Sequence, residues 1–203
     1  MSVDKSVLIS IQPKWCDYIM DGLKTYELRK TRPKIDGPFK CYIYCTKAKI
    51  KDDLLWDKGH TFIESLDDGR YDTGTNYDVY NGKVIGEFTC DYIYEVTCSR
   101  NAFDDEIDIY CAEDNLVTES CVGAEEMYAY FGDYVTGYAW HIKDFKLYDH
   151  GTPIEYFRSK PCESLVCQTC TNSWIKDIYR ADKFECGVRI KRPPQSWCYC
   201  YTP

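Results

Sequence analysis

A short stretch of the chain carries side chains whose types and spacing could bind an anion or act on a substrate. Residues 22–29 read G-x-K-T-x-E-x-R and supply Lys24, Thr25, Glu27 and Arg29. An arginine can pair with two phosphate oxygens at once, and a lysine adds a point charge beside it. Burial lowers the pKa of a lysine and frees it as a base or nucleophile. The stretch therefore indicates either a phosphate contact or lysine-based chemistry.

Alternation along a strand decides which of these side chains meet. The sequence after Gly22, a residue suited to end a helix, predicts a strand. In a regular strand Thr25, Glu27 and Arg29 share one face, and Lys24 lies on the side opposite Glu27. We therefore expect a Glu27–Arg29 ion pair, which is either structural or part of a ligand site.

The charge balance favours a confined anion contact over general binding of polyanions. The chain has 25 basic and 33 acidic residues and a net charge of -8, whereas non-specific binding to nucleic acid needs an excess of lysine and arginine. Residues 24–40 nevertheless carry six basic and two acidic side chains. The basic set comprises Lys14, Lys24, Arg29, Lys30, Arg32, Lys34, Arg189, Lys191 and Arg192. It indicates a local phosphate contact, and a solubilising strand edge is the alternative.

Tryptophans near these basic residues could stack a nucleic-acid base. Trp15, Trp140 and Trp197 lie in predicted helices or strands, and one or two of them could hold an unpaired base by stacking. Gln12 and Ser196 place polar groups close to two of these tryptophans, as a pocket that reads a base edge requires. The alternative is that the tryptophans fill the core.

Four cysteines near the C-terminus have a spacing compatible with a structural zinc ion. Cys162, Cys167 and Cys170 form C-x4-C-x2-C, and Cys186 follows 16 residues later. A C-x2-C turn directs two thiolates at one tetrahedral ion, and a second pair would close the site. Reduced structural thiols are the alternative, because the chain has 13 cysteines and an odd number cannot all pair within it.

Apolar and β-branched runs predict a chain with many strands and few helices. Pro13 suits the first turn of a helix. Residues 83–97 are expected to form one long strand, or two strands joined at a bulge, with Gly86 as the bend. The predicted strands are residues 6–11, 25–30, 39–46, 83–97, a pair within 138–149 and a last strand after the prolines at 193–194. The predicted helices are residues 13–22 and a segment near 125–131.

These elements predict an α+β fold: a mixed β-barrel with short flanking helices and insertions. We expect one domain over residues 1–150, with insertions at about 47–81 and 101–135. Residues 151–203 are expected to form a cysteine-containing tail that returns a final strand to the barrel.

The insertion near the middle of the chain is strongly acidic. Residues 101–142 contain ten acidic side chains and no lysine or arginine. This pattern is typical of a solvated face, and docking of a protein partner is the alternative.

The N-terminus has no apolar signal region, and no apolar run approaches the roughly 20 residues of a membrane span. We therefore expect a cytoplasmic protein without membrane contact.

The order of these motifs resembles the ASCH domain, a member of the PUA-like superfamily of small β-barrels. The residues that carry the resemblance are Ile11, Pro13, Gly22, Lys24, Thr25, Glu27, Arg29 and the run Val84-Ile85-Gly86-Glu87-Phe88. Residues 140–149 resemble the barrel-closing strand of longer members, many of them encoded by phages and prophages.

The resemblance implies a cleft beside the first helix that binds RNA or a modified nucleotide. The candidate binding residues are Gln12, Lys14, Trp15, Lys24, Thr25, Arg29, Lys30, Trp140, Ser196 and Trp197. We therefore expect a binding module, with no cofactor apart from a structural zinc ion if the cysteines hold one.

The resemblance also implies an alternative activity. A small ASCH branch hydrolyses the acetyl group of acetylated cytidine with a Lys-Thr-Glu arrangement. Lys24 matches that lysine, but Glu27 stands where the branch has threonine. The alternative is thus an amidohydrolase on an acylated nucleoside, with Lys24 as base and Glu27 or Glu87 positioning it. A phage-borne factor that binds a protein through its acidic face is the third hypothesis.

Overall fold

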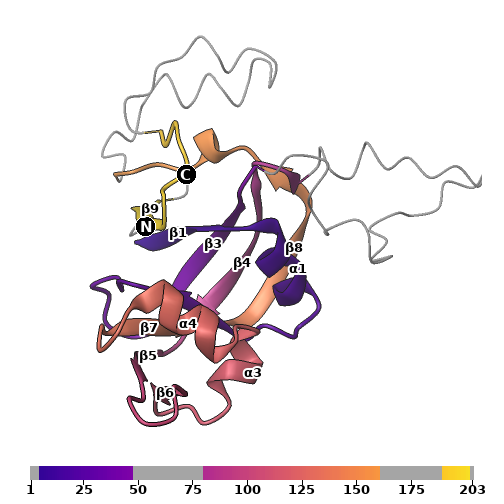
Figure 1. Ribbon diagram of the computed structural model, residues 1–203. Helices are drawn as coiled ribbons and strands as arrows, with labels where there is room; N and C mark the ends of the chain where they lie inside the picture. The colour runs from indigo at the N-terminus through magenta and orange to yellow at the C-terminus, as the bar shows by residue number, and fades with distance from the viewer. Residues whose placement is uncertain (1–4, 48–79, 161–188, 202–203) are drawn as a thin grey trace, which may run out of the picture.

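The computed structural model describes residues 5–47, 80–160 and 189–201. Within these residues the strands form two sheets accompanied by short helices (Figure 1). The strands are β1 (Ser6–Ile11), β2 (Tyr26–Arg29), β3 (Phe39–Cys45), β4 (Val84–Cys90), β5 (Ile93–Arg100), β6 (Ile107–Tyr110), β7 (Gly137–His141), β8 (Lys143–Thr152) and β9 (Trp197–Cys200). The helices are α1 (Pro13–Met20), α3 (Leu116–Ser120), α4 (Ala124–Phe131) and the 3₁₀ turn η1 (Ile154–Tyr156).

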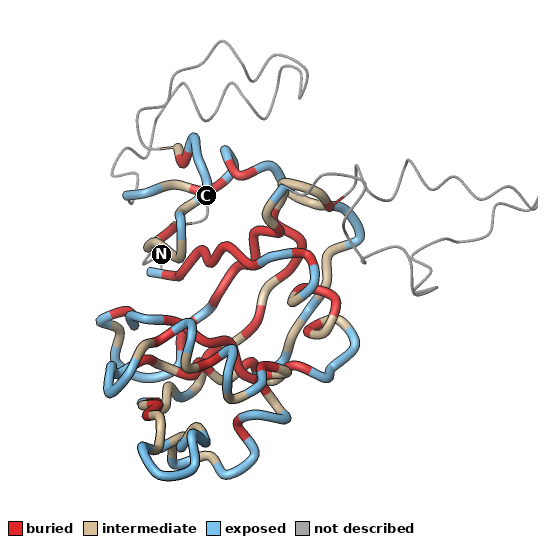
Figure 2. Tube along the Cα trace, in the orientation of Figure 1, coloured by how far each residue is buried: buried red, intermediate tan, exposed pale blue. Residues whose placement is uncertain are grey.

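The five-stranded sheet has the order β8-β4-β3-β1-β9. β1 and β3 run parallel, and α1 and β2 lie between them in the sequence. All six residues of β1 are buried because both faces of the sheet are covered, which explains why this strand reads as a continuous apolar run (Figure 2). Ile9 faces a core that includes Trp140, and Leu8 faces a second core with Phe157.

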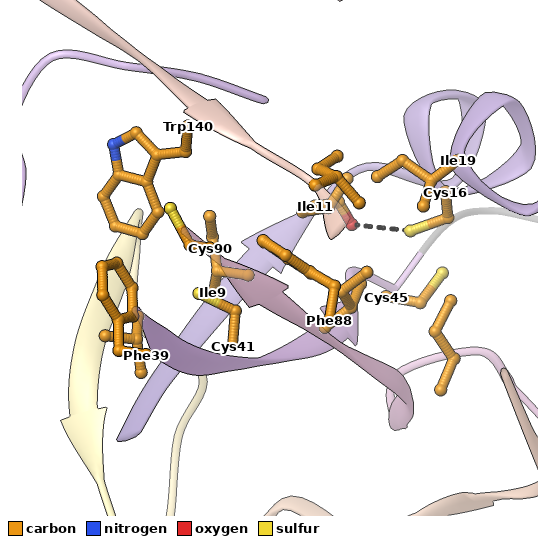
Figure 3. Packing of buried hydrophobic residues seen from close by; sticks show 14 of the residues in the cluster. Ile9, Ile11, Cys16, Ile19, Phe39, Cys41, Cys45, Phe88, Cys90 and Trp140 are labelled. Atoms are coloured by element: carbon orange, nitrogen blue, oxygen red, sulfur yellow. Dashed lines mark hydrogen bonds between the residues drawn. The ribbon is translucent and has the colours of Figure 1, made fainter. Parts of the chain in front are cut away.

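The main core lies between the two sheets. Trp140 from β7 packs edge-on against Phe39 from β3, with a ring-centroid distance of 5.9 Å. Figure 3 shows Cys41 and Cys90 in the same cluster, where thiols act as small apolar side chains. Burial raises the pKa of Cys90 to about 12, so this thiol is protonated and inert near neutral pH.

The four-stranded sheet has the order β2-β7-β5-β6. One of its faces packs against α3 and α4 through a cluster that includes Val96, Leu116, Met127 and Phe131. This packing fixes α3 beside β2, the strand that carries Glu27 and Arg29 of the G-x-K-T-x-E-x-R motif, and α4 beside β5 and β6.

The predicted strand over residues 83–97 is two strands in different sheets. The chain leaves β4 after Cys90 and enters β5 at Ile93. The irregularity expected at Gly86 is present, because the register of β4 against β3 and β8 shifts between Val84 and Gly86. A Cβ atom on Gly86 would lie 2.5 Å from the carbonyl oxygen of Lys146. Glycine is therefore needed here because β8 approaches closely.

The α+β class predicted from the sequence is confirmed. Over the described residues the strands form two sheets and do not close into a barrel. Most of the insertion predicted at 47–81 and most of the cysteine-containing tail lie outside the described residues, while β9 pairs antiparallel with β1. In the part of the chain that the structure describes, no helix has the length and apolar character needed to span a bilayer.

Candidate functional site

A pocket of about 1180 Å³ opens where β1, α1, β2, α4 and the chain before β9 meet. We call it the central pocket. Its walls include Ser10, Gln12 and Trp15 from the first βα unit, Glu27 and Arg29 from β2, Tyr130 from α4, Lys47 and Lys83, and residues 193–196. The polar groups at its walls thus come from segments that are far apart in the sequence.

Three charged side chains converge beside this pocket. The carboxylate of Glu27 lies 2.8 Å from Nη2 of Arg29 and 3.4 Å from Nζ of Lys24. All three residues are buried. One carboxylate therefore balances two buried cations, and we call these three residues the buried charge cluster.

The expectation that Lys24 lies on the side opposite Glu27 is wrong, because the two side chains are in contact. β2 begins at Tyr26, so strand alternation does not extend back to the two residues before it. Thr25 Oγ1 donates a hydrogen bond to Glu119 at 2.9 Å, which directs Thr25 toward α3.

Arg29 links β2 to both neighbouring segments of the pocket wall. Its Nη2 donates to the carbonyl oxygen of Ser10 at 2.6 Å, and its Nη1 donates to Oγ of Ser196 at 3.3 Å. Its Nε is buried and has no hydrogen-bond partner within the described residues. A buried donor without a partner is uncommon in native proteins.

Lys24 is held away from solvent. Its ammonium donates to the carbonyl oxygen of Ser120 at 2.7 Å, and its exposed fraction is 2%. Burial lowers the pKa of Lys24, and the charge of Glu27 opposes that shift. Lys24 does not line the central pocket, but it lies beside two residues that do, Glu27 and Trp15.

The chain before β9 closes one side of the central pocket. Oγ of Ser10 donates to the carbonyl oxygen of Pro194 at 2.7 Å, and the backbone N–H of Ser10 donates to the carbonyl oxygen of Ser196 at 2.9 Å. The first of these bonds joins residues 184 positions apart. The site therefore needs the C-terminal segment, which local sequence patterns could not indicate.

Three aromatic side chains line the central pocket, and two of them, Trp15 and Tyr130, are partly exposed, whereas Tyr44 is buried. Trp15 is half-buried, and Nζ of Lys14 lies 4.1 Å from the centroid of its ring. Tyr130 is 38% exposed, and Nζ of Lys30 lies 5.1 Å from its ring. The sequence reasoning selected Trp15, Lys14 and Lys30 but missed Tyr130. Tyr130 is one of three aromatic residues in α4, so the sequence carried no signal that distinguishes it.

The other two candidate tryptophans lie elsewhere. Trp140 has no exposed surface and belongs to the core (Figure 3). The Trp197 ring centroid lies 5.7 Å from that of Trp140, and its Nε1 donates to Oγ1 of Thr31 at 3.0 Å. Neither tryptophan lines the central pocket, whereas Gln12 and Ser196 both do.

Glu87 does not join the buried charge cluster. Its carboxylate accepts hydrogen bonds from Lys40 at 2.8 Å and from Oη of Tyr148 at 2.6 Å. Burial opposes ionisation of Glu87, but these two hydrogen bonds outweigh it and lower its pKa. Of the two glutamates considered as partners of Lys24, the structure places Glu27 beside it.

No group of three or more histidine, cysteine or acidic side chains among the described residues is arranged to hold a metal ion. The predicted zinc ligands Cys162, Cys167, Cys170 and Cys186 lie outside the described residues.

The solved structures that are similar to this chain include two of one protein. The first is ASCH from Zymomonas mobilis, with 15% sequence identity, a TM-score of 0.46, and coverage of 96% of this chain and 86% of that chain. The second is a mutant of the same protein in which phenylalanine replaces a tyrosine, with 16% identity, a TM-score of 0.42 and coverage of 97% and 90%. Both are ASCH proteins. No protein-family model and no curated protein matches the sequence.

Proposed function

We propose that the protein binds a nucleotide of single-stranded RNA, or a modified nucleotide, in the central pocket. The observation that carries the proposal is the combination of a pocket of about 1180 Å³, an excess positive charge beside it and aromatic side chains on its walls. Ligand pockets commonly measure about 300–1,000 Å³, so a nucleotide fits without rearrangement of the sheets.

The charges support an anionic ligand. The buried charge cluster holds two cations against one carboxylate, and Nε of Arg29 has no partner within the described residues. Lys47, Lys83 and Lys191 also line the central pocket. A phosphate beside these groups would gain charge-assisted hydrogen bonds, although Glu126 and Glu155 on the same walls reduce the net attraction.

The aromatic and amide groups support recognition of a base. Trp15 and Tyr130 offer ring surface to the pocket, and base–aromatic stacking contributes about 1–3 kcal/mol per base. Gln12, Gln195 and Ser196 supply donors and acceptors for a base edge. Single-stranded RNA is usually recognised through such exposed base faces and edges.

The test is equilibrium binding of the purified full chain to nucleoside monophosphates, modified nucleosides, and single-stranded RNA and DNA at two salt concentrations. We expect saturable binding that weakens with salt and is reduced at least about tenfold by Trp15→Ala. Tyr134→Ala is the matched control, because Tyr134 is 71% exposed and does not line the central pocket. Absence of binding to every ligand would contradict the proposal.

The amidohydrolase alternative has one observation in its favour, the lowered pKa of Lys24 beside Glu27. Against it, the ammonium is already hydrogen-bonded to the Ser120 carbonyl and lies behind the pocket wall. Release of acetate from acetylcytidine by the wild type, and its loss in Lys24→Met, would favour hydrolysis over simple binding.

A further inference from the structure

A second hollow of about 540 Å³ lies beside the central pocket. We call it the side hollow. It is lined by residues of β8 and by Tyr42, Glu87, Tyr156 and Phe157. No residue of the buried charge cluster lines it, so it is a separate depression with its own chemistry.

The two depressions are neighbours on one face of the five-stranded sheet. Tyr44 lines the central pocket and Tyr42 lines the side hollow. Residues two apart on a strand point to the same face and lie about 6.6 Å apart along it. Both tyrosines belong to the cluster that packs against Ile154 and Phe157.

The turn η1 separates the two depressions. Pro153, Ile154 and Glu155 line the central pocket, whereas Thr152, Tyr156 and Phe157 line the side hollow. A single 3₁₀ turn of three residues is about 6 Å long. The barrier between the depressions is therefore one short turn, which an extended ligand can cross.

The side hollow offers ring surface and little net charge. Tyr156 is 45% exposed, although the similar side chains of Tyr42 and Phe157 are buried beside it. Lys146 and Asp149 carry opposite charges, and the carboxylate of Glu87 is paired with Lys40. Stacking on an aromatic ring suits this surface better than phosphate binding does.

From this arrangement we propose that the two depressions are consecutive subsites for one single-stranded RNA, in which the central pocket holds one nucleotide and the side hollow stacks the base of a neighbouring nucleotide on Tyr156. This inference rests on the proposed function of the central pocket. It adds that the ligand is an oligonucleotide that crosses η1 and not an isolated nucleotide.

The test is a length series of 5′-phosphorylated oligoadenylates and oligouridylates of one, two and four nucleotides, titrated against the full chain. We expect affinity to rise about tenfold from the mononucleotide to the longer ligands. Tyr156→Ala should abolish that gain, leave mononucleotide affinity unchanged, and leave the salt dependence unchanged because stacking releases no counterions. Tyr134→Ala, another exposed tyrosine, should retain the gain.

The outcomes separate the two proposals. Mononucleotide binding without a gain in affinity with length, or a gain that survives Tyr156→Ala, would overturn the second subsite and leave the central pocket intact. Failure of the wild type to bind any member of the series would overturn both. Thermal unfolding of Tyr156→Ala should match the wild type, which shows that the loss arises from the ligand contact.

Discussion

The carboxylate of Glu27 lies 2.8 Å from the guanidinium of Arg29 next to the central pocket. Because Lys24 approaches the same carboxylate at 3.4 Å, this one anion holds two buried cations in place. Arg29 in turn bonds to Ser10 and Ser196. The relationship between Glu27 and Arg29 therefore couples the stability of β2 to the shape of the central pocket.

Removing the carboxylate of Glu27 should destabilise the protein more than removing the ammonium of Lys24. Glu27→Gln leaves two cations buried without an anion, and breaking a buried ion pair in this way costs about 3–5 kcal/mol. Lys24→Met leaves the Glu27–Arg29 pair balanced and mainly leaves the Ser120 carbonyl unpaired, at a cost of about 1–3 kcal/mol. Urea unfolding of both variants measures the difference. Equal losses would mean that the cluster is not coupled through Glu27.

Substitution of Trp140 should mainly reduce stability, whereas substitution of Trp15 should mainly reduce nucleotide binding. Trp140→Ala should cost about 3–5 kcal/mol of stability, because a fully buried ring is replaced by a cavity. Trp15→Ala should cost far less stability, since Trp15 is half-buried, but should lower nucleotide affinity. Denaturant midpoints and ligand titrations on both variants test this. Normal binding by Trp15→Ala would exclude Trp15 as a stacking surface.

The hydrogen bond that closes the wall of the central pocket should matter for binding as well as for folding. Ser10→Ala removes the donor to the Pro194 carbonyl, and loss of one such bond costs about 1 kcal/mol of stability. Nucleotide affinity should fall because residues 193–196 are held less firmly. Ser99→Ala is a control at another buried serine that does not line the pocket. An unchanged affinity in Ser10→Ala would show that this wall does not need the bond.

The free energy of unfolding should fall at acidic pH, in part because Asp91 becomes protonated. Its carboxylate lies 2.6 Å from Nδ1 of His141 and 3.4 Å from Nζ of Lys143. Burial raises the pKa of Asp91, but the contacts with His141 and Lys143 outweigh it and lower the pKa below its ordinary value. A lowered folded-state pKa gives stability that is present above the unfolded value, about 3.9, and is lost as the pH falls through the folded value.

Asp91→Asn isolates this contribution. The difference in unfolding free energy between the wild type and Asp91→Asn should be greatest above about pH 5 and should shrink as the pH falls below about 4. Denaturant unfolding at a series of pH values measures it. A difference that stays constant down to the lowest pH at which the protein folds would contradict the role of the Asp91 charge.

The sequence predicts the local elements of this fold well where burial leaves a clear pattern. β1 is a continuous apolar run because both of its faces are covered, and Pro13 starts α1 as expected. The break between β4 and β5 at Asp91 and Tyr92 was not predicted, because it carries no glycine or proline signal. Gly86 reflects close packing with β8, which is a tertiary effect.

The sequence predicted some of the residues that line the central pocket, but fewer of the contacts among them. The motif picked out Glu27 and Arg29, and both line the central pocket. The contact between Lys24 and Glu27 was missed because Lys24 precedes β2, where strand alternation does not apply. The bond from Ser10 to Pro194 joins chain segments that no local pattern relates.

The most direct test of the central claim is hydrogen exchange of the full chain with and without a saturating single-stranded tetranucleotide RNA. Slower exchange is expected for backbone amides around the central pocket, in residues 8–16, 26–30 and 195–197, with little change in residues 101–114. Exchange that is unchanged around the pocket, or protection concentrated in the acidic residues 101–114, would contradict the claim that the central pocket binds nucleotides.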